Sequence, residues 1–241
     1  MAGYDGRVTV AAVMLFTSPD DALVDTAGRS AVRRMVESAW AGGATPIVVV
    51  AADPSGSLAA ALAGSPAILA EPPGAEAGQV QQLLRGARIA SERVVETDAV
   101  LLWPGRMAWV DAETVTSLIE RHGVERESLL RPEYDGQPGW PALLPIDFVV
   151  QAAHVAPESD LGQLIEGLAG VRPLSLFDTG DPGTLNDATV ALDEMPVYAG
   201  PPEPARQAPE WGMAAADSPE DLPLEGPALA PYSQAADPES D

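Results

Sequence analysis

The sequence predicts an α/β domain built around a mostly parallel sheet, and three observations lead to that fold class. Residues 8–16 and 46–51 are continuous apolar runs, which is typical of strands buried on both faces. Between them, residues 30–41 place apolar side chains on one helical face, and Gly42-Gly43 ends that helix. A strand, a helix and a second apolar strand form a βαβ unit, which predicts parallel strands joined by a right-handed crossover.

The spacing of residues 30–41 assigns the two sides of this helix. We expect its inward side to hold Val32, Met35, Val36, Ala39 and Trp40. We interpret the opposite side, with Arg33, Arg34 and Glu37, as a solvated surface. Residues 17–21, which precede the helix, are predicted to be a loop.

The rest of the domain continues the alternation of strands and helices. The expected helices are residues 57–62, 79–95, 148–153 and 161–168, and the expected strands are residues 67–70, 99–103 and 173–177. Residues 129–134 are predicted to be an edge strand, because Pro132 at its centre cannot donate a hydrogen bond to a ladder. Residues 135–141 are predicted to be a rigid turn.

The stretch from Asp98 to Asp111 shows where a ligand is expected. Its apolar strand ends at Pro104-Gly105, and we expect Asp111 to cap the helix that follows. Such a break lies at the carboxyl edge of a parallel sheet, where the ligands of open α/β sheets bind. The residue that we expect to be exposed there is Arg106, a cation.

The composition excludes several classes of function. The chain has 241 residues, 46% of them hydrophobic, and 36 acids against 13 bases give a net charge of −23. This charge repels phosphate backbones and anionic lipids, so nucleic acid and membrane surfaces are not expected partners. All 13 bases are arginine, which excludes a lysine Schiff base or a phosphate-loop lysine. The absence of cysteine excludes disulfides and thiolate sites.

The two histidines do not have the spacing of a metal site or a catalytic triad. His122 and His154 are 32 positions apart, and we interpret both as surface or helix-end residues. No apolar run approaches the roughly 20 residues that a membrane span needs, and no secretory h-region follows the first residues. We therefore expect a cytoplasmic protein.

The composition changes near residue 200, which divides the chain into a domain (residues 1–199) and an acidic, proline-rich tail (residues 200–241). The tail holds nine prolines and nine acids with a single arginine. Two interpretations stay open: plain disorder, or a segment that lies over its own domain or a partner. Candidate anchors for the second are Trp211, Met213, Leu222, Leu224, Leu229 and Tyr232.

Four stretches kept in order resemble one known family. They are Asp25–Ser30 with the helix and strand after it, Asp98–Asp111, Tyr134–Leu144 and Asp178–Asp193. In this pattern the chain is similar to the MobA/MocA-like nucleotidyltransferases, which attach a nucleotide to molybdopterin to make the molybdenum cofactor. The resemblance implies a three-layer α/β/α, Rossmann-like domain with a mostly parallel sheet.

The departures from the family pattern bear on function. Where the family has a glycine-rich phosphate loop with Arg and Lys, residues 15–23 have no glycine and no base, and carry Asp20 and Asp21. The family aspartate that holds Mg²⁺ is matched by Arg106, and the family histidine by Trp140. Of the usual metal pair only Asp187 matches, as a single candidate metal ligand.

These departures favour a catalytically degenerate member of the family: a binding or assembly subunit linked to molybdenum-cofactor or molybdoenzyme maturation. Its expected partner is another protein or a second copy, and a nucleotide or molybdopterin is its candidate ligand. An alternative is an active nucleotidyltransferase with Mg²⁺ and CTP or GTP, whose candidate nucleotide-binding residues are Arg29, Arg106, Arg131, Gly136 and Gly139. A second alternative is a small-molecule oxidoreductase on the same scaffold.

Several other polar and aromatic residues have simple structural interpretations. We expect Trp103 and Trp109 to pack in the core and over the site rather than stack on bases. We interpret Asp135, Asp178 and Asp181 as turn-forming residues.

Overall fold

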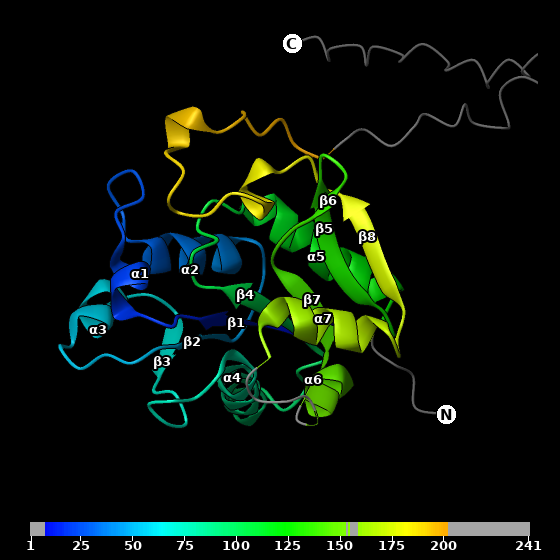
Figure 1. The fold of residues 1–241 in the computed structure, drawn as a ribbon, viewed down its shortest axis with the longest axis horizontal. Coiled ribbons are helices and arrows are strands. Elements are labelled where there is room, and N and C mark those ends of the chain that lie inside the picture. The colour runs from blue at the N-terminus through cyan, green and yellow to red at the C-terminus, as the bar shows by residue number, and fades with distance from the viewer. Residues whose placement is uncertain (1–7, 153, 155–158, 202–241) are drawn as a thin grey trace, which may run out of the picture. The chain divides into compact units, whose positions relative to one another are not determined.

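The computed structural model describes residues 8–152, 154 and 159–201, and within them a central eight-stranded sheet lies between two layers of helices (Figure 1). The strand order is β3-β2-β1-β4-β7-β5-β6, and β8 pairs with β5. The three-layer α/β/α prediction is confirmed. The predicted tail falls almost wholly outside the described residues, so its boundary and its order stay predictions.

The parallel half of the sheet is formed by the apolar runs near the N-terminus. Strand β1 (Val10–Leu15) lies between β2 (Ile47–Val50) and β4 (Ala99–Pro104), and β3 (Ala67–Ala70) pairs with β2, all in parallel. Every residue of β1 is buried, because helices cover both faces of the sheet.

Alternate residues of β1 point into two separate cores. Val10, Ala12 and Met14 belong to the core beneath α2 (Ala31–Ala41) and α5 (Ala112–Val124). The short helices α1 (Pro19–Leu23) and α3 (Ser57–Ala61) contribute to the same core. The other residues of β1 face the second core, formed with α4 (Gln79–Arg93), α6 (Ile146–Ala152) and α7 (Leu161–Ala169). The period of two along the strand thus divides its side chains between the helical layers.

The second half of the sheet differs from the prediction. Strand β5 (Leu129–Tyr134) is not an edge strand: it pairs with β7 (Ala142–Pro145) in antiparallel and with β8 (Leu174–Asp178) in parallel. Strand β7 also pairs with β4 in antiparallel and was not predicted. The predicted turn 135–141 contains β6 (Gln137–Pro138), which forms a hairpin with β5. The sign of this hairpin in the sequence is Asp135-Gly136, both with positive φ, a pair typical of two-residue hairpin turns.

Two predictions near α2 are also wrong. The loop predicted at residues 17–21 runs into α1, because Ser18 accepts a hydrogen bond from the Asp20 N–H and Pro19 occupies the first helical position. Trp40, expected to face inward, is 57% exposed, since α2 ends at the next residue and the core does not extend that far. The remaining four inward residues of α2 are buried as expected.

The histidine at the end of α5 lies in its last turn, but His122 is buried rather than on the surface. His154 is exposed. Within the described residues, no helix combines the length and apolar character needed to cross a membrane.

Candidate functional site

The carboxyl ends of β1 and β4 meet closely, and this contact places Arg106. The Gly105 N–H donates a 2.8 Å hydrogen bond to the Leu15 carbonyl. A Cβ on Gly105 would lie 2.4 Å from the Phe16 ring and 2.6 Å from the Leu15 carbonyl oxygen, so only glycine fits this approach. The next residue, Arg106, therefore leaves the sheet at the edge where the sequence predicts a ligand.

A cavity of about 240 Å³ lies at this edge. Its lining comes from the ends of β1 and β4, from α1, from the start of α4 and from Asp187: Leu15, Phe16, Thr17, Asp21, Gln79, Pro104, Gly105, Arg106, Met107 and Asp187. Its volume is below the roughly 300–1,000 Å³ that is usual for small-molecule pockets.

Arg106 lies between two carboxylates. Its Nη1 is 3.7 Å from Asp21 Oδ1, and its Nε is 3.4 Å from Asp187 Oδ2. The Ala188 N–H donates a 2.8 Å hydrogen bond to the Arg106 carbonyl, which fixes the residue-187 loop against the β4–α5 connection. The Arg106 side chain is 45% exposed. The family resemblance placed Arg106, Asp187 and the residue 15–23 loop with Asp21 at one site, but it did not predict that Arg106 would pair with Asp21.

The environment of Asp187 stabilises its charged form. Burial raises the pKa of this carboxyl, but hydrogen bonds from the Thr189 hydroxyl and N–H and the charge of Arg106 outweigh burial and leave the pKa below its usual value. Asp187 is therefore an anion, held by a turn on one side and by a guanidinium on the other.

Trp109, near the other end of the β4–α5 connection, also forms hydrogen bonds with the residue-187 loop. Its Nε1 donates to the carbonyls of Asp187 (3.1 Å) and Val190 (3.0 Å). The Arg34 guanidinium lies 4.9 Å from the Trp109 ring centroid and also donates to the Thr26 carbonyl. Arg34 is thus not the solvated residue that its helix position suggested. Trp103 is fully buried, as expected. Trp109 packs against the residue-187 loop and Arg34, and the expectation that it does not stack on a base stays a prediction.

A second cavity, of about 710 Å³, is lined by Trp109, by Asp25 and Ala27, and by residues 188–193. It lies along the loop that directly follows Asp187, and its walls are mostly apolar or aliphatic. Asp25 and Asp193 are its charged residues.

Asp181 is a buried carboxylate that links the loop before residue 187 to the start of α5. It is 1% exposed, and its carboxylate accepts hydrogen bonds from the Asp111 N–H, the Thr114 hydroxyl and the Gly183 N–H. Burial raises its pKa, although these three donors oppose the shift. The turn role predicted for Asp181 is confirmed, and the structure adds a tie to α5, whose N-cap is Asp111 as predicted.

Arg131, a candidate phosphate-binding residue, donates hydrogen bonds to the protein backbone. The Gly139 N–H donates to the Pro132 carbonyl, but Pro132 has no N–H to return the bond to the Gly139 carbonyl. Arg131 Nε supplies that bond at 2.9 Å, and Nη2 donates to the Pro138 carbonyl at 3.1 Å. The guanidinium also lies 4.6 Å from the Trp140 ring centroid. Arg131 therefore replaces the missing proline donor, which explains how Pro132 sits inside the sheet.

The other candidate nucleotide-binding residues occupy separate turns. Arg29 belongs to the tight turn at residues 25–30 and forms a 2.5 Å ion pair with Glu37. Gly136 has φ +70° in the β5–β6 turn, and a Cβ there would meet open space. Gly139 packs against Thr184, and a Cβ at this position would lie only 2.6 Å from the Thr184 Cβ. Arg106 alone of these candidates lines the cavity with Asp187, and the nucleotide-binding roles of all five stay predictions.

The residues at this edge do not fit a magnesium ion. Mg²⁺ binds proteins through one or two carboxylates together with substrate phosphates. Both carboxylates here face the guanidinium of Arg106, a fixed positive charge that repels a cation. In the described part of the chain, no group of three or more His, Cys, Asp or Glu side chains could hold a metal.

The connection from β1 to α1 does not resemble a phosphate cradle in the structure either. It runs through Thr17 and Ser18 into Pro19, which has no N–H to offer an anion. The first turn of α1 carries Asp20 and Asp21, which oppose the binding of a phosphate.

Open parallel strands in the order 3-2-1-4 between two helical layers, with loops converging at the carboxyl edge, define a Rossmann-like α/β protein. The model of the MobA-like NTP transferase domain matches residues 16–172, and the chain belongs to that family. No curated protein sequence matches this chain.

Several solved structures, a nucleotidyl transferase among them, share the fold. A nucleotidyl transferase from Methanothermobacter superposes with a TM-score of 0.57 at 17% identity, covering 70% of this chain and 87% of its own. A Mycobacterium tuberculosis H37Rv protein in complex with manganese gives 0.55 at 16% identity, with 71% and 88% covered. A CMP:2-keto-3-deoxy-manno-octonic acid synthetase in complex with CTP gives 0.53 at 16% identity, with 70% and 89% covered. At these identities the likeness concerns the fold alone.

Proposed function

We propose that this protein has the NTP transferase fold without the transfer chemistry, and that it acts as a binding or assembly subunit in molybdenum-cofactor or molybdoenzyme maturation. The main support for the loss of nucleotidyl transfer is the position of Arg106 between Asp21 and Asp187. A guanidinium there neutralises the two carboxylates that a catalytic cation would need. The link to molybdenum rests on the family alone.

The surroundings of Arg106 support the same proposal. The β1–α1 connection offers acids where a triphosphate would need amides and bases. Arg29 and Arg131 are engaged with Glu37 and with backbone carbonyls, so they do not converge with Arg106 on one phosphate group. An arginine-clamped transferase would require such convergence.

Thermal unfolding with CTP, GTP or ATP, each with and without Mg²⁺, tests the proposal. A ligand at 100 times its dissociation constant stabilises a protein by about 2.7 kcal/mol, so real binding is easily seen. We expect no magnesium-dependent stabilisation of the wild-type protein. A magnesium-dependent rise in Tm that disappears in Asp187→Ala would contradict the proposed loss of nucleotidyl transfer and would favour an active nucleotidyltransferase.

A substitution at Arg106 gives the complementary test. Arg106→Asp removes the guanidinium and adds a third carboxylate beside Asp21 and Asp187, so we expect it to gain a Mn²⁺-dependent rise in Tm. Arg93→Asp, at the exposed end of α4, makes the same charge change away from the site and serves as the control. Equal Mn²⁺ responses in the two variants would show that Arg106 does not take the place of a cation.

The proposed partner contact is tested on the chain itself. We assign the partner-facing role to the acidic segment 200–241, which falls outside the described residues apart from its first two positions. Affinity purification from the native host would use two baits, the full chain and a chain that ends at residue 201. A partner protein should be recovered reproducibly with the full chain and not with the shortened chain. Unchanged recovery with the shortened chain would contradict that role.

A further inference from the structure

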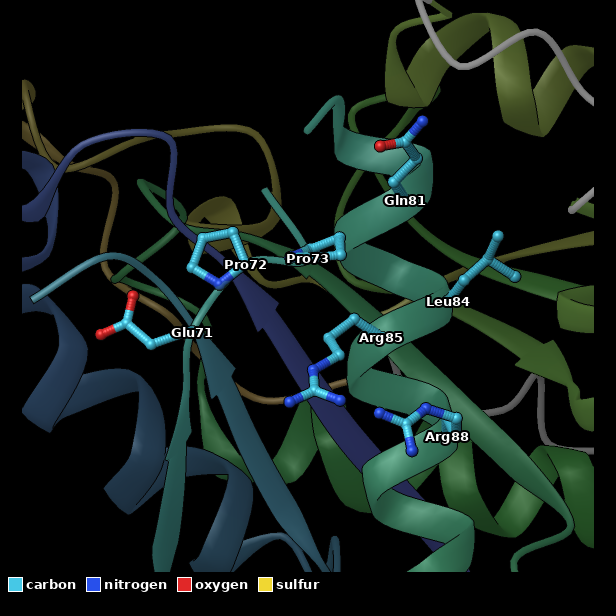
Figure 2. Close-up of a pocket in the computed structure, with 7 residues that line it drawn as sticks. All are labelled: Glu71, Pro72, Pro73, Gln81, Leu84, Arg85 and Arg88. Atoms are coloured by element: carbon cyan, nitrogen blue, oxygen red, sulfur yellow. The ribbon is translucent and has the colours of Figure 1, made fainter. Parts of the chain in front are cut away.

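A cavity of about 620 Å³ lies between the end of β3 and the flank of α4, away from the site at Arg106. Its lining consists of Glu71, Pro72, Pro73, Gln81, Leu84, Arg85 and Arg88, and it shares no residue with the cavity around Arg106 (Figure 2). Its volume lies within the usual range for small-molecule pockets.

The position of this cavity follows from the sheet. Strand β3 is the last strand on its side and pairs only with β2 among the described residues. The lining residues of α4 recur at i, i+3, i+4 and i+7, which gathers them in one stripe along the helix. The opposite stripe, with Leu83 and Ala87, packs into the core. One flank of α4 is therefore left open beyond the edge of the sheet.

Two arginines from this stripe supply positive charge. Figure 2 shows the guanidinium groups of Arg85 and Arg88 reaching from α4 to the same side, toward the strands, while the Glu71 carboxylate points away from them. No ion pair joins Glu71 to either arginine in the described part of the chain. This concentration of positive charge stands out in a protein of net charge −23.

The Nε of Arg85 is a buried donor that lacks a hydrogen-bond acceptor among the described residues. A buried donor without an acceptor is costly and is normally paired. Among residues 8–152, 154 and 159–201, the ion-pair partner of Arg88 is Glu92, four residues along the same helix, and the two side chains are 53% and 60% exposed. Exposed pairs of this kind are weak, so Arg88 can exchange its partner for a ligand.

The remaining walls are suited to the uncharged part of a ligand. Pro72, Pro73 and Leu84 present apolar surface next to the two guanidinium groups. Pockets that combine apolar walls with a few convergent polar groups bind small organic molecules, and arginine favours phosphate and carboxylate oxygens.

We propose that the cavity between β3 and α4 binds a small organic anion: a molecule with a phosphate or carboxylate group that pairs with Arg85 and Arg88 and an apolar body that lies on Pro72, Pro73 and Leu84. The site is independent of the one at Arg106 and of the function proposed for it.

Isothermal titration of the full-length protein with phenyl phosphate, benzoate and neutral phenol tests the proposal. We expect both anions to bind and phenol not to bind, with phenyl phosphate tighter because its dianion faces two guanidinium groups. Arg85→Met keeps helix propensity and most of the apolar stem, and should weaken phenyl phosphate at least about tenfold, or 1.4 kcal/mol. Arg88→Met should weaken it less.

Two control variants separate this site from others. Arg93→Met, on the same helix outside the cavity, and Arg106→Ala, at the other site, should leave phenyl phosphate binding unchanged, and circular dichroism checks that each variant is folded. The proposal is overturned if neither anion binds at millimolar concentration, if phenol binds as well as the anions, if Arg85→Met keeps wild-type affinity, or if Arg106→Ala abolishes binding.

Discussion

The sheet around Arg131 and the carboxyl edge around Arg106 use the same side chain in opposite ways. Arg131 is packed against Trp140, and burial lowers the pKa of its guanidinium, whose Nε supplies the backbone hydrogen bond that Pro132 cannot make. Arg106 is 45% exposed and faces Asp21 and Asp187 at 3.4–3.7 Å. The first arginine is part of the fold, whereas the second occupies a position where the fold usually receives a ligand. Replacing Arg131 should therefore lower the free energy of unfolding much more than replacing Arg106.

The largest effect is expected in the sheet. Arg131→Leu should lower the free energy of unfolding by about 3 kcal/mol, because the carbonyl of the buried Gly139 loses a charged donor and the Trp140 ring loses its cation. Chemical denaturation measures the change. A loss as small as that of an exposed arginine, such as Arg93→Leu, would break the comparison.

A double-mutant cycle sharpens the same point. Pro132→Ala restores a backbone N–H opposite the Gly139 carbonyl, so in the Arg131→Leu background it should recover about 1 kcal/mol. In the wild-type background, where Arg131 already supplies that hydrogen bond, the same change should be close to neutral. If the two substitutions add without coupling, Arg131 does not stand in for the proline donor.

A pH-dependent effect is expected from His122, another buried polar group. Burial lowers its pKa, with Arg126 acting in the same direction and Asp98 opposing both, and its Nδ1 has no partner among the described residues. The folded pKa is thus below the unfolded value of about 6.5. Its contribution to stability is present above that value and is lost as the pH falls below it. Denaturation curves from pH 7.5 to 5 should show this loss.

His122→Leu is the control for that pH dependence. Leucine keeps the buried volume and removes the titration, so the fall in stability below pH 6.5 should be smaller than in the wild type. Parallel curves for the two proteins would assign the pH dependence to other groups.

The smallest effect is expected at the carboxyl edge. Arg106→Ala should change the free energy of unfolding by only about 0.5 kcal/mol, since exposed ion pairs contribute little. It should also remove the charge that helps to lower the Asp187 pKa, so this pKa, followed by NMR, should rise. A loss comparable to that of Arg131→Leu would show that the edge is as structural as the sheet.

The sequence alone determined the elements whose periodicity is unambiguous. The apolar runs that became β1, β2 and β4, the amphipathic stripe of α2 and the Asp111 cap all follow from local patterns. The carboxyl edge was also predictable, because a buried strand that breaks at Pro104-Gly105 before a capped helix can end only there.

Only the tertiary structure decided what lies beside these elements. β5 became an interior strand despite Pro132, because a neighbouring side chain supplied the hydrogen bond that the backbone lacked. Asp21 joined Arg106 and Asp187 although 85 positions separate Asp21 from Arg106 in the sequence. Hydrophobic periodicity reports which face of an element is buried, but the pairing of individual donors, acceptors and charges depends on neighbours that only the folded chain brings together.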